Sequence, residues 1–162
     1  MITGKYPSLR LRRSRKNDWS RRLIEENNLT SNDFILPIFL TDGKNKKIPI
    51  KSMPGVYRYS LDKVNYIVDK AIKNGLPMIA LFPYTDLNKK DSLGSEALNK
   101  DNLVCRALQL IKKKYKNEIG IMCDVALDPY TSHGHDGIII KNKINNDETV
   151  KILVKQALLQ AK

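Results

Sequence analysis

Three short apolar runs are spaced along the chain, each bounded by turn residues. They cover residues 34–40, 78–83 and 119–127, and they have the length of buried strands. Pro37 weakens the first of them, because proline cannot donate to a sheet ladder. The runs are apolar at successive positions rather than at alternate ones. They therefore predict a sheet that is covered on both faces, which is typical of parallel strands between helices.

Amphipathic stretches with a 3.6-residue period alternate with these runs. The predicted helices cover residues 61–74, 101–115 and 147–162. Ser60 is expected to cap the first of them and Gly75 to end it. A shorter helix is expected over residues 18–28, while residues 48–50 and 56–59 indicate a small hairpin or tight turn. Strand and helix thus alternate three times, which favours an α/β fold with right-handed crossovers.

The last predicted helix has no glycine or proline after it, and three parallel strands would leave two open edges. A complete (β/α)₈ barrel takes roughly 250 residues. We therefore expect an extended N-terminal arm over residues 1–17, and the first three βα units of a TIM barrel over residues 18–162. Open edges leave backbone groups unpaired, so we do not expect the isolated chain to be a stable monomer.

The amino-acid composition indicates the class of protein and the compartment in which we expect it. Apolar residues make up 41% of the chain, which argues against disorder, and no run reaches the 18 apolar residues of a membrane span. The first residues lack the apolar region of a signal peptide. Two cysteines make a disulfide framework improbable, so we expect a reducing, cytoplasmic location.

The charge is +12, from 29 basic and 17 acidic residues. The 21 lysines are scattered and accompany 14 asparagines, a composition typical of AT-rich coding sequence rather than of a nucleic-acid interface. Basic residues cluster only near the N-terminus, where the arginines are Arg10, Arg12, Arg13, Arg15, Arg21 and Arg22. Spacing leaves open whether this arm binds phosphates, pairs with acidic residues of another subunit or is solvated.

The richest candidate chemistry follows the third predicted strand, and parallel α/β folds bind ligands at this end of their strands. This segment, residues 124–137, contains three carboxylates: Asp124 is expected on the strand, and Asp128 and Asp136 on the loop. Oxygen ligands favour Mg²⁺ or another hard cation, whereas His133 and His135 could serve a borderline metal. Cys123 stands alone, which argues against a thiolate zinc site. Simple turn chemistry, with Asp128 as a cap and glycines at positive φ, explains the segment equally well.

Four stretches carry a specific family pattern. They are Arg10-Leu-Arg-Arg13 with Asn17-Asp-Trp19, Pro49 to Arg58, Ala80 to Asn99, and Asp124 to Ala157. Together they resemble the porphobilinogen synthase (δ-aminolevulinic acid dehydratase) family over essentially the whole chain. The string Asp124 to Gly137 is the most specific of the four.

This resemblance implies a TIM barrel whose N-terminal arm, with Arg10, Arg12 and Arg13, embraces a neighbouring subunit in an octamer-type homo-oligomer. It implies condensation of two 5-aminolevulinate molecules to porphobilinogen, with loss of two waters, in tetrapyrrole (heme) biosynthesis. No membrane or nucleic-acid partner is expected. Asp124 matches an active-site aspartate of the family.

The resemblance also bears on the metal. Zinc-type members carry three cysteines where this chain has Ala126, Asp128 and Asp136. The chain is thus similar to the aspartate-rich type that uses Mg²⁺ or a monovalent cation, with Asp124, Asp128 and Asp136 as expected ligands and no three-cysteine zinc site.

The family's two Schiff-base lysines, and the later arginines that hold substrate carboxylates, match no position in the 162 residues. We therefore expect the chain alone to be catalytically incomplete, with a complementary C-terminal half as a possible partner. The alternatives are a non-catalytic remnant or half of a split enzyme, a metal-assisted hydrolase that uses Asp124, Asp128 and the histidines, and a nucleic-acid-binding module that uses the arm.

Overall fold

The computed structural model describes residues 4–162, so the first three residues of the expected arm lie outside the described part. Backbone contacts divide the chain after Thr30 into two compact units. The first unit contains the 3₁₀ helix η1 (Arg13–Arg15) and helix α1 (Asp18–Leu23). α1 is shorter than the helix expected over residues 18–28, and the segment from residue 18 to Thr30 groups with the arm rather than with the second unit.

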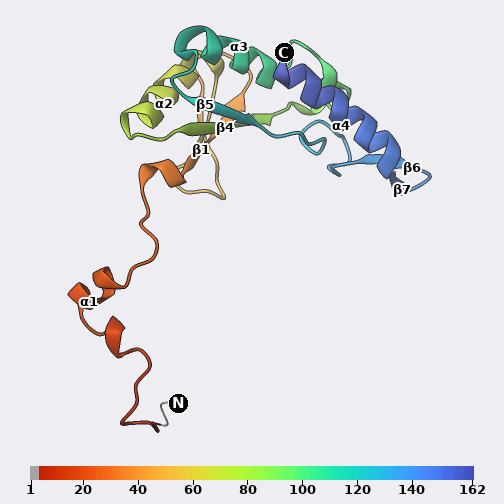
Figure 1. Ribbon diagram of the computed structural model, residues 1–162. Helices are drawn as coiled ribbons and strands as arrows, with labels where there is room; N and C mark the ends of the chain where they lie inside the picture. The colour runs from red at the N-terminus through yellow and green to blue at the C-terminus, as the bar shows by residue number, and fades with distance from the viewer. Residues whose placement is uncertain (1–3) are drawn as a thin grey trace. The chain divides into compact units, whose positions relative to one another are not determined.

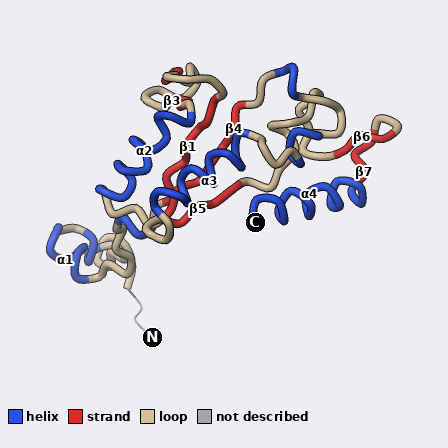
Figure 2. The backbone as a smooth tube through the Cα atoms, turned by 90° about the horizontal axis from the view of Figure 1, so that it is seen from above, coloured by secondary structure: helices blue, strands red, loops and turns tan. Residues whose placement is uncertain are grey.

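A five-stranded sheet forms the centre of the second unit, in the order β2-β3-β1-β4-β5. Figure 2 labels four of these strands, β3, β1, β4 and β5. The strands are β1 (Ile35–Thr41), β2 (Lys47–Pro49), β3 (Tyr57–Tyr59), β4 (Met78–Tyr84) and β5 (Gly120–Cys123). β1 pairs in parallel with β3 and β4, and β4 pairs in parallel with β5. The mostly parallel α/β sheet is confirmed, and the hairpin expected over residues 48–50 and 56–59 is the antiparallel pair β2–β3. This hairpin joins the sheet through β3, so the sheet has five strands rather than the three expected.

Helices α2 (Leu61–Lys73) and α3 (Leu103–Tyr115) lie on the same side of this sheet (Figure 1). Their inner faces and the strands form one core, which includes Val64, Val68, Ala107, Ile111, Ile38, Leu40, Ile79 and Leu81. On the opposite face, Met122 is 43% exposed and Ile35 is 45% exposed. The prediction of a sheet covered on both faces is therefore wrong for the described residues, in which one face packs against helices.

Side chains cap some of the helices, but not all of them. The Asn102 side chain accepts the Cys105 N–H at 2.9 Å and so caps α3. Gly75 has a φ of +70° after α2, as a helix-ending glycine should. Ser60 sits at the expected N-cap, but its hydroxyl accepts the Lys46 N–H at 2.8 Å instead of capping α2. The hydroxyl therefore fixes the loop before β2 to the start of the helix.

The third predicted strand is shorter than its apolar run. β5 ends at Cys123, so Asp124 lies beyond the strand and the expectation that it lies on the strand is wrong. The following loop contains an unexpected hairpin, β6 (Ile138–Ile140) and β7 (Lys143–Asn145). Lys141 and Asn142 turn it with φ values of 51° and 59°, the left-handed conformation that two-residue hairpin turns require.

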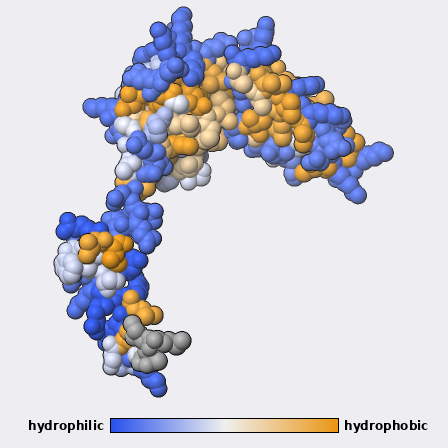
Figure 3. Space-filling model, viewed as in Figure 1, coloured by the Kyte–Doolittle hydropathy of each residue, from blue (hydrophilic) through white to orange (hydrophobic). Residues whose placement is uncertain are grey.

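Helix α4 (Asn146–Ala161) closes the described fold, and the Asn145 side chain caps it by accepting the Glu148 N–H at 3.1 Å. Ile152 and Leu153 pack on a second, smaller core that contains Leu127, Tyr130 and Ile138. Its other apolar residues Val150, Val154 and Leu158 are exposed, and Figure 3 shows apolar surface along this helix. Among the residues described, no helix is both long enough and apolar enough to cross a membrane.

Candidate functional site

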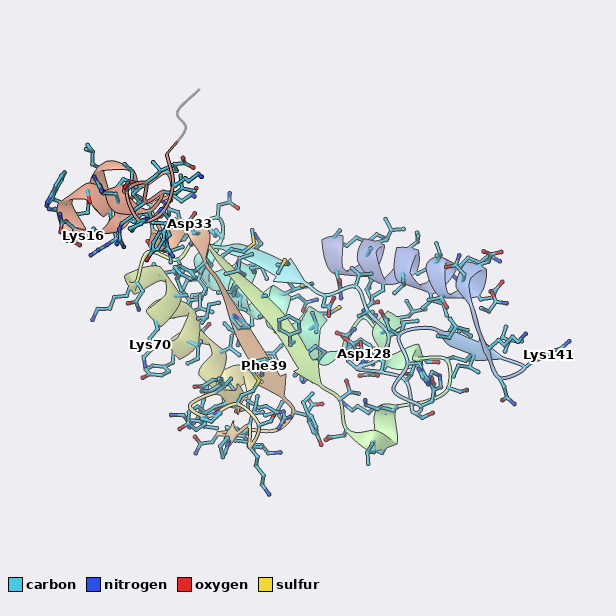
Figure 4. The ribbon with its side chains drawn as sticks, turned by 90° about the horizontal axis from the view of Figure 1, so that it is seen from below. Lys16, Asp33, Phe39, Lys70, Asp128 and Lys141 are labelled. Atoms are coloured by element: carbon cyan, nitrogen blue, oxygen red, sulfur yellow. The ribbon has the colours of Figure 1, made fainter. Side chains whose placement is uncertain are left out.

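A pocket of about 280 Å³ opens where the parallel strands end. It is lined by Phe39, Arg58, Phe82, Pro83, Tyr84, Lys90, Asp124, Asp128 and Pro129. Phe39 of β1 lies in register with Phe82 of β4, and their rings stack with centroids 5.6 Å apart. Figure 4 labels Phe39 at the end of β1 and Asp128 on the segment after β5. The volume is near the lower limit for ligand pockets, so it suits a small molecule.

Opposite charges meet in this pocket. Asp124 and Asp128 supply carboxylates, and Arg58 and Lys90 supply cations. The Arg58 guanidinium stacks over the Tyr84 ring at 4.6 Å from its centroid, which fixes the side chain at the pocket wall. The Lys90 ammonium donates to the backbone carbonyl of Asp128 at 3.4 Å. A polar, zwitterionic small molecule would find partners for both of its charges here.

The carboxylate of Asp128 is electrostatically strained. Partial burial raises its pKa above the ordinary value, and the nearby carboxylates of Asp136 and Asp124 raise it further. A shared negative field of this kind is relieved by protonation or by a bound cation. The three aspartates singled out in the sequence thus lie close enough to interact.

The chain between Asp124 and Leu127 is held by side chains. Gln160 Nε2 donates to the Asp124 carbonyl at 3.3 Å, and Gln156 Nε2 donates to the Ala126 carbonyl at 3.1 Å. The Leu127 N–H donates to Asp136 Oδ1. Both glutamines come from α4, so this helix determines where the two pocket carboxylates are presented.

Two of the side chains considered as metal ligands are already engaged. Asp136 accepts the Leu127 N–H through Oδ1, a hydrogen bond that leaves its second carboxylate oxygen able to bind an ion. His133 Nε2 donates to the Ser92 carbonyl and its Nδ1 accepts the His135 N–H, both at 3.2 Å, so neither of its ring nitrogens is free. Within residues 4–162, no three His, Cys, Asp or Glu side chains gather closely enough to hold a metal ion.

The loops that follow β4 and β5 are joined to each other. The Asp91 N–H donates to the Tyr130 carbonyl at 3.3 Å, and the Ser132 N–H donates to the Asp91 carbonyl at 2.8 Å. The Asp91 carboxylate accepts the N–H groups of Ser95 and Leu93, and these hydrogen bonds, with that of Ser95 the strongest, lower its pKa. The pocket wall is therefore one connected structure rather than two independent loops.

An ion-pair cluster lies beside the pocket and was not anticipated from the sequence. Lys89 Nζ donates to Asp42 Oδ2 at 2.8 Å, and Arg106 donates to Asp42 Oδ1. Burial alone would raise the pKa of Asp42, but the hydrogen bonds from Lys89 and Arg106 outweigh it and lower the pKa. The cluster ties the end of β1 to α3 and to the loop that carries Lys90.

The structure thus brings Asp124 and Asp128 to one pocket, with Asp136 behind them. Ala126 is buried and does not line the pocket. In the first unit, Arg10, Arg12 and Arg13 line a separate hollow with Leu9 and Trp19. The sequence reading missed Arg58, Gln156 and Gln160, because no local pattern marks an isolated arginine or a helix glutamine as part of a site.

Comparisons with known proteins agree on one family. The family model described as delta-aminolevulinic acid dehydratase matches residues 8–162. A protein of that name from Bradyrhizobium diazoefficiens is 56% identical over 154 residues, which are 95% of this chain and 43% of the relative. A protein of the same name from Chlamydia pneumoniae is 40% identical over 95% of this chain and 46% of the relative.

A solved structure supports the same assignment. The crystal structure of delta-aminolevulinic acid dehydratase (porphobilinogen synthase) from Toxoplasma gondii, in complex with the reaction product porphobilinogen, superposes with a TM-score of 0.87. It is 39% identical in sequence, and the match covers 94% of this chain and 44% of that chain. The chain therefore spans less than half the length of the relatives that it matches.

Proposed function

Because the chain belongs to the delta-aminolevulinic acid dehydratase family, we propose that it forms part of an enzyme that condenses two 5-aminolevulinate molecules to porphobilinogen and two waters. The pocket that joins Asp124 and Asp128 with Arg58 and Lys90 carries this proposal. 5-Aminolevulinate bears an ammonium and a carboxylate, so the two carboxylates and the two cations of the pocket complement its charges. Asp124 would exchange protons with the bound substrate.

We infer that the described sheet is the first part of a (β/α)₈ barrel. Strands β3, β1, β4 and β5 are parallel, and helices cover one face of the sheet. The other face carries Phe39, Phe82 and Met122 toward what would be the barrel interior. The arm with Arg10, Arg12 and Arg13 would contact a neighbouring subunit in a homo-oligomer. A cytoplasmic location also stays a proposal, based on the composition.

The carboxylates of Asp124 and Asp128 fit a hard cation, Mg²⁺ or a monovalent ion, better than zinc. Such an ion, when bound, supplies positive charge that stabilises a substrate oxygen. Asp136 would add a third carboxylate, because only its Oδ1 accepts the Leu127 N–H, and the remaining ligands would come from water or from groups outside these residues. Both ring nitrogens of His133 are engaged, which disfavours a metal-assisted hydrolase that uses this histidine.

None of the lysines in these 162 residues matches an imine-forming lysine of the family. Lys90 is the lysine of the pocket, and its Nζ donates to the backbone carbonyl of Asp128. The covalent step of the family uses its own imine-forming lysines, and Lys90 matches neither of them. We therefore propose that the 162 residues alone do not complete the reaction.

A fusion tests the proposal. This chain replaces the 154 matched residues of the Bradyrhizobium relative, and porphobilinogen formation from 5-aminolevulinate is measured. The fusion should be active, and Asp124→Asn should lower its rate by at least about 100-fold, the usual effect of losing an acid–base group. Asp101→Asn, at an exposed carboxylate before α3, is the matched control.

A folded fusion without activity, or an active Asp124→Asn variant, would contradict the proposed role of this site. The 162-residue chain is assayed in parallel with 5-aminolevulinate and borohydride. Turnover or a stoichiometric lysine adduct in that sample would contradict its proposed incompleteness.

A further inference from the structure

We propose that Gln156 and Gln160 are positioning residues, which hold the segment from Asp124 to Leu127 in place of a neighbouring β-strand. The inference rests on the proposed function of the pocket, because it concerns how Asp124 and Asp128 are presented there. Neither glutamine lines the pocket, so both would act through the backbone that carries the carboxylates.

The segment continues β5 without the sheet. The ladder between β4 and β5 runs to Leu81 and Cys123, and no ladder pairing is found beyond it in the described residues up to Leu127. A buried carbonyl outside a sheet needs another donor, and the Gln156 amide supplies one to the carbonyl of the buried Ala126. Asp124 is exposed, and there the Gln160 amide takes the place of a water molecule at the carbonyl.

The spacing of the glutamines fits this purpose. Four residues of α-helix rise about 6 Å, and two residues of extended chain rise about 6.6 Å. Gln156 and Gln160 are four apart, and the carbonyls that they bind, those of Ala126 and Asp124, are two apart in the opposite direction. α4 therefore runs antiparallel to the segment and matches its repeat, as a paired strand would.

Stability alone does not explain these amides. Gln156 is fully buried, and the Oε1 atoms of Gln156 and Gln160 have no hydrogen-bond partner in the described structure. Methionine in place of Gln156 would leave the Ala126 carbonyl unpaired and remove the unpaired Oε1. The number of buried unpaired acceptors stays the same, so the net cost to folding should be small. The contribution of the amide is therefore to orient the Ala126 carbonyl through its directional N–H.

The segment is also fixed at its far end. The Leu127 carbonyl accepts the N–H groups of Tyr130 at 2.8 Å and Thr131 at 2.9 Å, and the Leu127 N–H is bound by Asp136. Asp128 follows this fixed turn, and Asp124 begins the segment that the glutamines hold. Loss of one glutamine would therefore move one carboxylate relative to the other without unfolding the turn.

The first test uses the 162-residue chain with Gln156→Met and Gln160→Met, and with Gln109→Met on the exposed face of α3 as the control. Carbonyl ¹³C shifts report hydrogen bonds to each carbonyl. Gln156→Met should move the Ala126 signal and Gln160→Met the Asp124 signal, while Gln109→Met moves neither. The Tm of each variant should stay within about 3 °C of the parent.

The second test places the same substitutions in the fusion enzyme. Each glutamine variant should lower kcat about tenfold to a hundredfold with little change in KM, because a displacement near 1 Å at a reacting group has effects of this size. Unchanged kcat in both variants, or a loss of kcat that accompanies a large loss of Tm, would overturn the positioning role. If the parent fusion is inactive, the proposed function fails instead, and unchanged carbonyl shifts would still overturn the inference.

Discussion

Leu81 and Met122 allow the one-sided packing of the sheet to be measured. Leu81 of β4 is fully buried in the core that β1 and β4 form with α2 and α3. Met122 of β5 is 43% exposed, and it points to the opposite face, because its neighbour Cys123 is in register with Leu81. Truncating each side chain to alanine compares the two faces directly.

The expected costs differ severalfold. Replacing a fully buried leucine by alanine costs about 2–5 kcal/mol, since it removes apolar contacts and leaves a cavity. A fully buried methionine contributes about 1.5–3 kcal/mol, so truncating the half-exposed Met122 should cost about 1 kcal/mol or less. Against a typical total of about 5–15 kcal/mol, Leu81→Ala should shift the unfolding transition strongly and Met122→Ala only slightly.

Urea unfolding followed by circular dichroism at two protein concentrations provides the measurement. Equal losses in the two variants that do not depend on concentration would refute the one-sided sheet. Equal losses that grow with concentration would show that a second copy of the chain covers the Met122 face. An unchanged slope of the unfolding free energy with urea is the control that the unfolded state has not changed.

Two further predictions concern titrating groups. Burial raises the pKa of Asp128, with Asp136 and Asp124 adding to it, so its favourable contribution is complete below about pH 3.9 and is lost as the pH rises through the raised value. Asp128→Asn should therefore raise the unfolding free energy at neutral pH but not in acid, and a loss at neutral pH would contradict this. Burial, with a smaller effect of Cys105, raises the pKa of Cys123 to about 11, so labelling of the native thiol by iodoacetamide should be about 100-fold slower than in the urea-unfolded chain. Labelling at equal rates in both states would count against the buried thiol.

The elements of the second unit were predictable where apolar pattern and turn residues agree. The helix expected over residues 61–74 is α2, because its apolar period and Gly75 specify the same end. The run over residues 119–127 predicted too long a strand, because Leu127 is buried in the core beside α4 rather than by sheet pairing. An apolar pattern predicts that residues are buried, but it does not predict which neighbouring element covers them.

The two short hairpins also show what a local sequence pattern can and cannot predict. The pair β6–β7 is only three residues long on each side, and its turn residues Lys141 and Asn142 have positive φ without the glycine that usually marks such a turn. β3 was expected as part of a hairpin, whereas its parallel pairing with β1 depends on a long-range register between Phe39 and Arg58. Pairings between segments distant in sequence have no local signature.

Residues that carry their own chemistry can be singled out from the sequence. Asp124 and Asp128 stand out as carboxylates at the end of a strand and line one pocket, while their catalytic and metal-binding roles stay predictions. The groups that share the pocket or hold its backbone come from β3, from the loop after β4 and from α4. Their role depends on tertiary placement, so a sequence pattern cannot distinguish Gln156 from any other glutamine of an amphipathic helix.

The connection between the loops after β4 and β5 has a consequence for motion. Asp91 is bound through its backbone to Tyr130 and Ser132, Lys90 reaches Asp128, and His133 reaches Ser92. Segments joined by several hydrogen bonds open as one cooperative unit in hydrogen exchange. The two loops should therefore share one opening free energy, and a substitution in either of them will change the rate at which both admit solvent to the pocket.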